Sequence, residues 1–181
     1  LVHTFNKVMR FRVHIYEQKG LLGISLRYIP LFYKKVRELG LPQYLEKMLR
    51  TDSGLILVAG IHDSGRSTTV AALINTLNEL GPPRYITTIE SPIERLYANN
   101  KCIIDQLEVG KDVSSYLHGL KRAHIDDIDV IVLEAISDGG VVRSMLEALE
   151  GGATVIAILN APSAVDAVSK VLGYIEPIES I

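Results

Sequence analysis

The chain has 181 residues, of which 48% are hydrophobic and 22% charged, and its formal net charge is −2. This composition is typical of a folded globular protein and excludes a disordered chain. The near-neutral charge predicts no general attraction to nucleic acid or to an anionic membrane. No apolar run approaches the roughly 20 residues of a membrane-spanning helix, so no membrane insertion is expected. The single cysteine, Cys102, excludes an internal disulfide framework, suits a reducing compartment and is expected to be a buried thiol.

The first fifty residues predict an N-terminal arm of short strands. Residues 8–17 alternate charged and apolar side chains, as a half-buried strand does. Two glycines follow, and residues 24–29 predict a second short strand. Residues 36–49 have apolar positions at helical spacing and predict a helix. We place a domain boundary near residue 51, which separates the arm and linker (1–50) from a core (51–181).

From residue 55 onward, short apolar runs alternate with helical patterns. Nearly continuous apolar runs indicate strands buried on both faces, and hence a mainly parallel sheet between helices. The predicted fold class is therefore α/β. The expected strands are 55–59, 85–89, 102–106, 129–133 and 154–159, and the expected helices lie at about 67–80, 113–124, 140–150 and 164–172.

The loop after the first core strand carries the main motif. Residues 60–69 read Gly-Ile-His-Asp-Ser-Gly-Arg-Ser-Thr-Thr, between an apolar strand and a helical segment. Glycines at both ends let successive N–H groups turn inward, and the new helix adds its positive N-terminal end, as in a phosphate-binding P-loop. The Ser67 hydroxyl would then meet a magnesium ion that bridges the phosphates. The alternative is an ordinary strand-to-helix turn with a Ser/Thr cap, since Arg66 stands where the motif has lysine. The expected nucleotide-binding residues of this loop are Gly60, His62, Asp63, Ser64, Gly65, Arg66, Ser67, Thr68 and Thr69.

Polar residues follow three other core strands. Glu134 ends an apolar run, where P-loop proteins place the magnesium-holding Walker B carboxylate. Ala135 stands next, where many ATPases have a glutamate that polarises water, and since successive strand side chains point to opposite faces, Glu134 is not expected to replace it. Glu90 lies beyond the carboxyl end of its strand, where parallel sheets bind ligands. The alternative for Glu134 is a solvent-exposed acid at a strand end, and the alternative for Glu90 is a turn that carries exposed carboxylates. Asn160 after the last strand is either a γ-phosphate sensor or a turn residue.

Taken in order, these motifs resemble the secretion and type IV pilus ATPase superfamily, closest to its pilus retraction (PilT-like) members. Residues 10–13 resemble the arginine-rich last strand of the family's N-terminal domain, and residues 26–30 resemble its linker. The remaining landmarks are residues 55–69 for Walker A, 88–94 for the Asp box, 106–110 for the stretch after it, 129–138 for Walker B and 152–164 for the His box.

The resemblance implies a RecA-like P-loop NTPase core preceded by the tail of a small PAS-like α+β domain. It implies a homo- or hetero-hexameric ring on the cytoplasmic side of the inner membrane, held there by a pilus or secretion platform protein. ATP or ADP with Mg²⁺ would lie between subunits, with Glu90 and Glu134 catalytic and with Ser67 and Glu134 as metal ligands. Planar guanidinium groups from the arm would reach the phosphates across subunits, although each could instead lie on a solvated strand face. These inter-subunit arginines are Arg10, Arg12 and Arg27.

The chain departs from the family at its catalytic residues. Arg66 replaces the Walker A lysine, Ser91 the Asp-box aspartate, Ala135 the Walker B glutamate, Ser137 the arginine after it, and Ala153 and Asn160 the two His-box histidines. Arginine keeps positive charge near the phosphates but is wider and less adaptable than lysine. Losing a water-orienting carboxylate typically slows turnover by about 2–4 orders of magnitude.

The sequence therefore predicts a divergent motor subunit, linked to pilus retraction or twitching motility, that binds ATP with weak or absent hydrolysis. The alternative is a pseudo-ATPase that acts as a structural or regulatory partner of an active paralogue.

Overall fold

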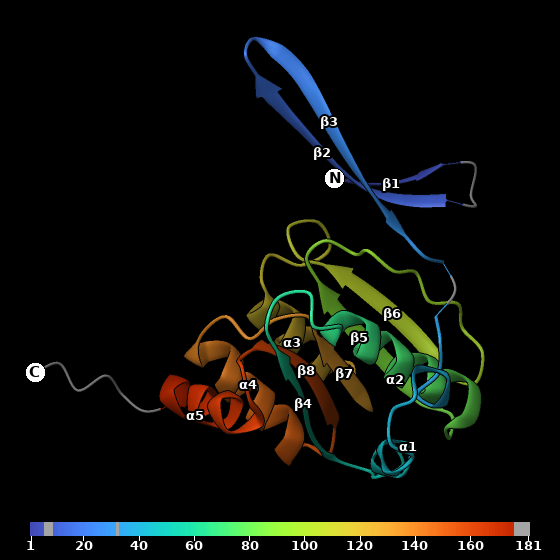
Figure 1. Ribbon diagram of the computed structural model, residues 1–181. Coiled ribbons are helices and arrows are strands. Elements are labelled where there is room, and N and C mark those ends of the chain that lie inside the picture. The colour runs from blue at the N-terminus through green and yellow to red at the C-terminus, as the bar shows by residue number, and fades with distance from the viewer. Residues whose placement is uncertain (6–8, 32, 176–181) are drawn as a thin grey trace, which may run out of the picture.

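The computed structural model describes residues 1–5, 9–31 and 33–175, which form an N-terminal antiparallel sheet and a larger α/β core (Figure 1). The N-terminal sheet, here called the arm, has the strand order β1 (Val2–Phe5), β2 (Met9–Gln18) and β3 (Leu21–Ile29). The strand predicted at 8–17 is confirmed as β2, although its first residue lies outside the described residues. Within the described ranges, no helix has both the length and the hydropathy needed to cross a membrane.

The second arm strand is longer than predicted. The pair Lys19 and Gly20 makes a tight hairpin with φ angles of 54° and 72°, so only these two residues separate β2 from β3. Gly23, which was expected to interrupt the chain, pairs with Tyr16 inside the hairpin. A Cβ at Gly23 would meet the Tyr16 ring, so the absence of a side chain leaves room for the ring. The strand β3 continues through Gly23.

The helix predicted at 36–49 is wrong. The segment instead forms a short 3₁₀ turn, η1 (Arg37–Leu39), and the five-residue helix α1 (Tyr44–Met48). Gly40 has a φ of 69° and ends the first turn, and Pro42 follows it. Because Val36 and Leu49 at the two ends are buried, the segment packs on the core although it is not one continuous helix. The division at residue 50 remains a prediction.

The core is a five-stranded parallel sheet in the order β4-β8-β7-β5-β6. Its strands are β4 (Gly54–Gly60), β5 (Tyr85–Glu90), β6 (Ile103–Glu108), β7 (Val130–Leu133) and β8 (Thr154–Asn160). The helices are α2 (Arg66–Leu80), α3 (Tyr116–Ile125), α4 (Gly139–Glu150) and α5 (Ala164–Ile175). The predicted α/β class and all five core strands are thus confirmed, within one or two residues at most ends.

Helices cover both faces of this sheet, as the apolar strands predict. One core cluster joins α2 and the α1 segment to strand residues such as Ile86 and Ile156. The other joins α3, α4 and α5 to strand residues such as Ile131 and Val155. Cys102 is buried in the first cluster, as expected.

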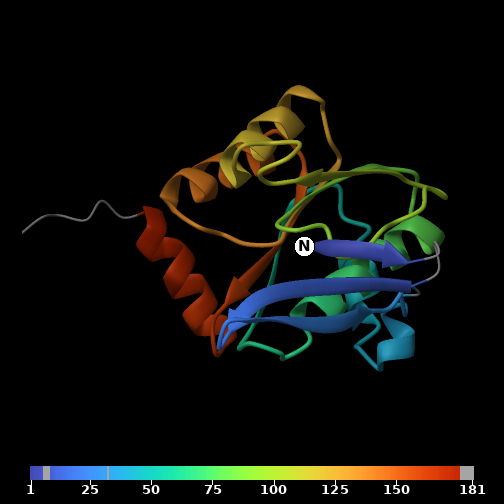
Figure 2. The same ribbon diagram turned by 90° about the horizontal axis from the view of Figure 1, so that it is seen from above.

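The arm lies above the edge where the carboxyl ends of the core strands gather (Figure 1). Seen from above, its strands extend across the core (Figure 2). The arm is fastened there by Arg10, whose guanidinium donates from Nη2 to the Ile93 carbonyl at 2.6 Å and from Nε to the Glu94 carbonyl at 2.6 Å. The fold therefore brings arm residues and strand-end residues around one space.

Candidate nucleotide-binding site

The loop between β4 and α2 has the curled backbone of a phosphate loop. Asp63 and Gly65 both adopt left-handed conformations, with φ angles of 59° and 91°, and the Ser64 N–H donates to the Ile61 carbonyl at 3.3 Å. Alternation of this kind turns successive N–H groups toward one side, which is the geometry of an anion-binding nest. A Cβ at Gly60 would collide with the Ser64 hydroxyl, so a larger residue there would displace the Ser64 side chain within the loop.

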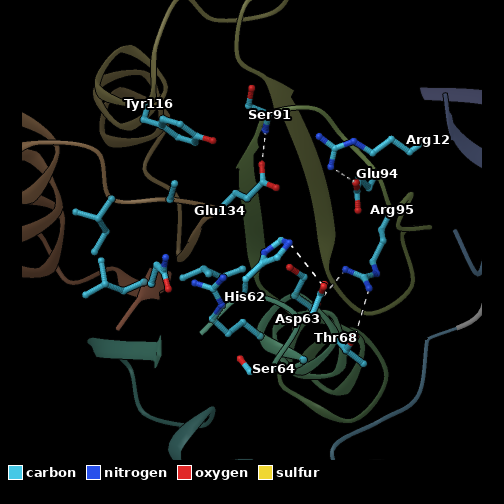
Figure 3. Close-up of a pocket in the computed structure, with 18 of the residues that line it drawn as sticks. Arg12, His62, Asp63, Ser64, Thr68, Ser91, Glu94, Arg95, Tyr116 and Glu134 are labelled. Atoms are coloured by element: carbon cyan, nitrogen blue, oxygen red, sulfur yellow. Dashed lines mark hydrogen bonds and ion pairs between the residues drawn. The ribbon is translucent and has the colours of Figure 1, made fainter. Parts of the chain in front are cut away.

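A cleft of about 530 Å³ opens in front of this loop, in the size range of ligand pockets (Figure 3). It is bounded by the loop, by residues beyond the carboxyl ends of β5 and β7, by the carboxyl end of β8, and by the arm. The sequence-predicted residues that line it are Arg12, Arg27, His62, Asp63, Ser64, Gly65, Arg66, Ser67, Thr68, Glu134 and Asn160. Gly60, Thr69, Glu90 and Arg10 are not among the residues that line this cleft.

Glu134 faces the loop across the cleft, where its carboxylate accepts a hydrogen bond from the Ser91 backbone N–H (Figure 3). Burial raises the pKa of Glu134 to about 7, against the lowering effect of the Ser91 hydrogen bond, and the nearby Glu90 carboxylate adds to the rise. Ala135 lines the cleft as well. Because β7 ends at Leu133, the strand alternation on which the expectation of opposite faces rested does not extend to these two residues.

Glu90 ends β5 in a more enclosed position. Its Oε1 accepts hydrogen bonds from Thr88 Oγ1 at 2.6 Å and from Gln106 Nε2 at 2.9 Å. Burial nevertheless raises the pKa of Glu90, because the two hydrogen bonds offset it only in part. The carboxylate lines a small recess of about 40 Å³ beside α2, which Ser67 and Glu134 also line. Glu90 and Glu134 therefore approach the first turn of α2 from two neighbouring strands.

The three predicted arm arginines have different surroundings. Arg12 Nη1 lies 2.9 Å from Glu94 Oε1, and Arg27 Nη2 lies 3.6 Å from Asp63 Oδ1 of the loop, so both reach the cleft with an acidic partner. The Arg10 guanidinium is engaged by Ile93 and Glu94 carbonyls and by Thr4 Oγ1 at 3.0 Å. Arg10 thus fastens the arm to the loop after β5, and a role across subunits remains a prediction for all three.

The family comparison agrees with this geometry. The sequence model of the family described as "Type II/IV secretion system protein" matches residues 32–174. The chain belongs to this family. It is of the pilus ATPase, PilT-like kind, and its core fits the RecA-like ATPase domain that the sequence predicted.

Its relatives include pilus proteins. The chain is 36% identical over 163 residues to the uncharacterised protein YggR of Escherichia coli K12, covering 90% of this chain and 50% of that protein. It is 34% identical over 165 residues to the type IV pilus retraction ATPase PilT of Pseudomonas aeruginosa, covering 91% of this chain and 48% of that protein. The crystal structure of the pilus retraction motor PilT with bound ADP superposes with a TM-score of 0.91 at 33% identity, covering 99% of this chain and 52% of that one. The chain thus spans about half the length of the relatives it matches.

The other family positions that differ in this chain have separate local roles. Ala153 is buried at the start of β8, at the end of the strand remote from the cleft. Ser137 donates through Oγ to Asp138 Oδ2 at 2.7 Å, and Asp138 caps the N-terminus of α4. Asn160 borders the cleft, and its backbone carbonyl accepts from Lys170 Nζ at 3.2 Å.

Sequence reasoning missed Arg95, Tyr116 and Lys170, which all line the cleft. Arg95 directly follows the acidic turn singled out at 88–94, so its charge beside that motif was an available signal. Tyr116 opens α3 close to Glu134, and burial together with the Glu134 carboxylate raises the pKa of its hydroxyl to about 12. No sequence pattern pointed to Tyr116 or Lys170, because only the fold brings α3 and α5 to the cleft.

The residues present fit a magnesium ion poorly. Mg²⁺ needs oxygen donors in near-octahedral geometry. Of its two predicted ligands, Glu134 already accepts the Ser91 N–H. Ser67 has a cation beside it, because the Arg95 guanidinium donates to the Ser67 backbone carbonyl at 3.1 Å. A fixed cation beside Ser67 opposes a second one.

Proposed function

We propose that this chain is a divergent pilus- or secretion-type ATPase subunit that binds adenine nucleotide in the cleft and hydrolyses it weakly or not at all. One observation carries the proposal: the phosphate loop keeps its curled backbone, whereas the acidic residues across the cleft, after β7, are altered. There, Ala135 has no carboxylate and the Glu134 carboxylate is bonded to the Ser91 N–H. A carboxylate oxygen that already accepts the Ser91 N–H is less free to orient an attacking water.

The choice of nucleotide rests on the similarity to the PilT motor whose structure contains ADP. The cleft supports a polyphosphate ligand, since Arg66, Arg95 and Lys170 line it together with the loop N–H groups. By the same similarity, the subunit would act in pilus retraction or twitching motility. It would join a homo- or hetero-hexameric ring that contacts a platform protein at the cytoplasmic face of the inner membrane.

A second function has its own supporting observation. Arg66, in the place of the P-loop lysine, leaves the loop without the compact charge that follows the γ-phosphate during transfer. A pseudo-ATPase would keep the fold and the nucleotide site and serve as a structural or regulatory partner of an active paralogue.

Calorimetric titration with ATP in magnesium buffer tests binding, and a steady-state phosphate-release assay tests turnover. We expect measurable binding and turnover at least about 100-fold below that of an active family motor. The double variant Arg66→Lys with Ala135→Glu should raise the rate, whereas each single variant should raise it less because the two groups act together. Wild-type turnover equal to that of an active motor contradicts the proposal. A double variant that binds ATP and gains no turnover favours the pseudo-ATPase.

A further inference from the structure

Arg95 is held against the first turn of α2 by several contacts. Its Nη1 donates to the Ser67 carbonyl at 3.1 Å, and its Nη2 lies 3.5 Å from Thr68 Oγ1 (Figure 3). Its guanidinium carbon lies 5.9 Å from the centre of the Tyr33 ring, within cation–π range. The Arg95 carbonyl accepts from Gln106 Nε2 at 2.7 Å, which fixes the backbone beneath the side chain. The guanidinium is thus a fixed charge beside the phosphate loop.

The small recess beside α2 gathers acids around this cation. Glu90, Glu94 and Glu134 line it, together with Ser67 and Arg95. Among the described residues that line the recess, Arg95 is the one that carries positive charge. In P-loop enzymes the position next to this serine is where a divalent cation neutralises phosphate oxygens. Here the Arg95 guanidinium lines the same recess as Ser67 and donates to the Ser67 backbone carbonyl.

We propose that Arg95 takes the electrostatic place of the divalent cation, so that the cleft binds a nucleoside di- or triphosphate without Mg²⁺. The inference rests on the nucleotide binding proposed above and adds which group neutralises the negative charge of the phosphates. Guanidinium has five N–H donors, and the contacts to Ser67 and Thr68 leave others for phosphate oxygens. Arg66 adds a second charge at the loop, which also lowers the need for a metal ion.

Isothermal titration of the wild-type protein with ADP and with ATP, once in magnesium buffer and once in excess EDTA, tests the inference. We expect the two dissociation constants for each ligand to agree within about threefold, because the fixed arginines meet the phosphate charge in both buffers. Binding in magnesium that weakens about tenfold or more in EDTA overturns the role of Arg95 and leaves the proposed nucleotide binding intact. Absence of binding in both buffers overturns both.

The variant Arg95→Gln separates Arg95 from a general loss of charge. It should weaken binding about tenfold in EDTA and less in magnesium, where the ion can enter the space that the guanidinium leaves. The matched control is Arg143→Gln, an exposed arginine of α4 that does not line the cleft, which should leave both constants unchanged. If Arg95→Gln loses the same affinity in both buffers, Arg95 is an ordinary phosphate contact, and the proposal that it replaces a metal ion is refuted. If that variant fails to fold, the wild-type comparison still decides.

Discussion

At the scale of single residues, Glu134 is a carboxyl group kept in the fold at a free-energy penalty. Its folded pKa of about 7 lies above the ordinary glutamate value of 4.5, and burial is the main cause. A group with a raised folded pKa binds more protons when folded, so its penalty is absent below the unfolded pKa and complete above the folded one. Stability should therefore fall as pH rises from about 4.5 to about 7.

We predict that Glu134→Gln raises the free energy of unfolding by about 1 kcal/mol at pH 8, after allowance for solvent screening, and changes it little at pH 5. For a chain of this size that is a rise in melting temperature of about 2–4 °C. Thermal unfolding at the two pH values measures the effect. Glu150→Gln, at an exposed position on α4, is the control and should show no such difference. A Glu134→Gln protein no more stable than wild type at pH 8 would refute the penalty.

At the scale of elements, the loop between β4 and α2 depends on its glycines. We predict that Gly60→Ala weakens nucleotide binding about tenfold or more, since the added Cβ collides with the Ser64 hydroxyl and opens the loop. Gly173→Ala is the matched control, because Gly173 lies in α5 with free space around its Cβ position and should gain about 0.5–1 kcal/mol of stability. Titration with ADP and thermal unfolding measure the pair, and unchanged affinity in Gly60→Ala would show that the loop tolerates the shift.

The joint between arm and core depends on Arg10. We predict that Arg10→Gln loosens the arm, because two short hydrogen bonds from a charged group to the Ile93 and Glu94 carbonyls are lost, each worth about 1.5–3 kcal/mol. Hydrogen exchange should speed up in β1–β3 and in the loop after β5 while α3–α4 keep wild-type protection. Arg27→Gln removes an exposed pair at 3.6 Å and should change little. Equal exchange in Arg10→Gln and wild type would mean that other contacts hold the arm.

The elements that could be predicted from the sequence are those with a local cause. The apolar runs predicted five parallel strands, and the two glycines predicted where the loop between β4 and α2 lies in the chain. The helix at 36–49 was predicted wrongly, because tertiary burial of Val36 and Leu49 produces apolar spacing without a helix. The hydrogen bond between Ser91 and Glu134 and the contact of Arg95 with α2 join residues 43 and 28 positions apart. No local pattern in the sequence predicts such contacts, so the surroundings of Glu134 and Arg95 could be described only from the structure.

At the scale of the whole molecule, the two faces of the arm differ sharply. The register β1-β2-β3 places Arg10, Arg12 and Arg27 on one face, toward the core and cleft. The opposite face is mostly apolar, with His3 and Glu17 as polar members at its ends. Its exposed apolar members are Phe5, Met9, Ile15, Leu22, Ile24, Leu26 and Tyr28, with exposed fractions between 40% and 81%. Contiguous apolar surface on this scale is uncommon on soluble monomers and binds apolar probes.

We predict that the chain binds the dye ANS in its native state through this face. The double variant Ile24→Lys with Leu26→Glu should reduce the fluorescence at least about twofold, since both side chains are more than half exposed and adjacent on the same face. Replacing Ile125 and Val165, which are even more exposed but lie on separate core helices, is the control and should leave the signal largely unchanged. Circular dichroism confirms that each variant stays folded. If the control lowers the fluorescence as much as the arm variant, the dye reports scattered apolar residues, and the arm face has no special role in binding it.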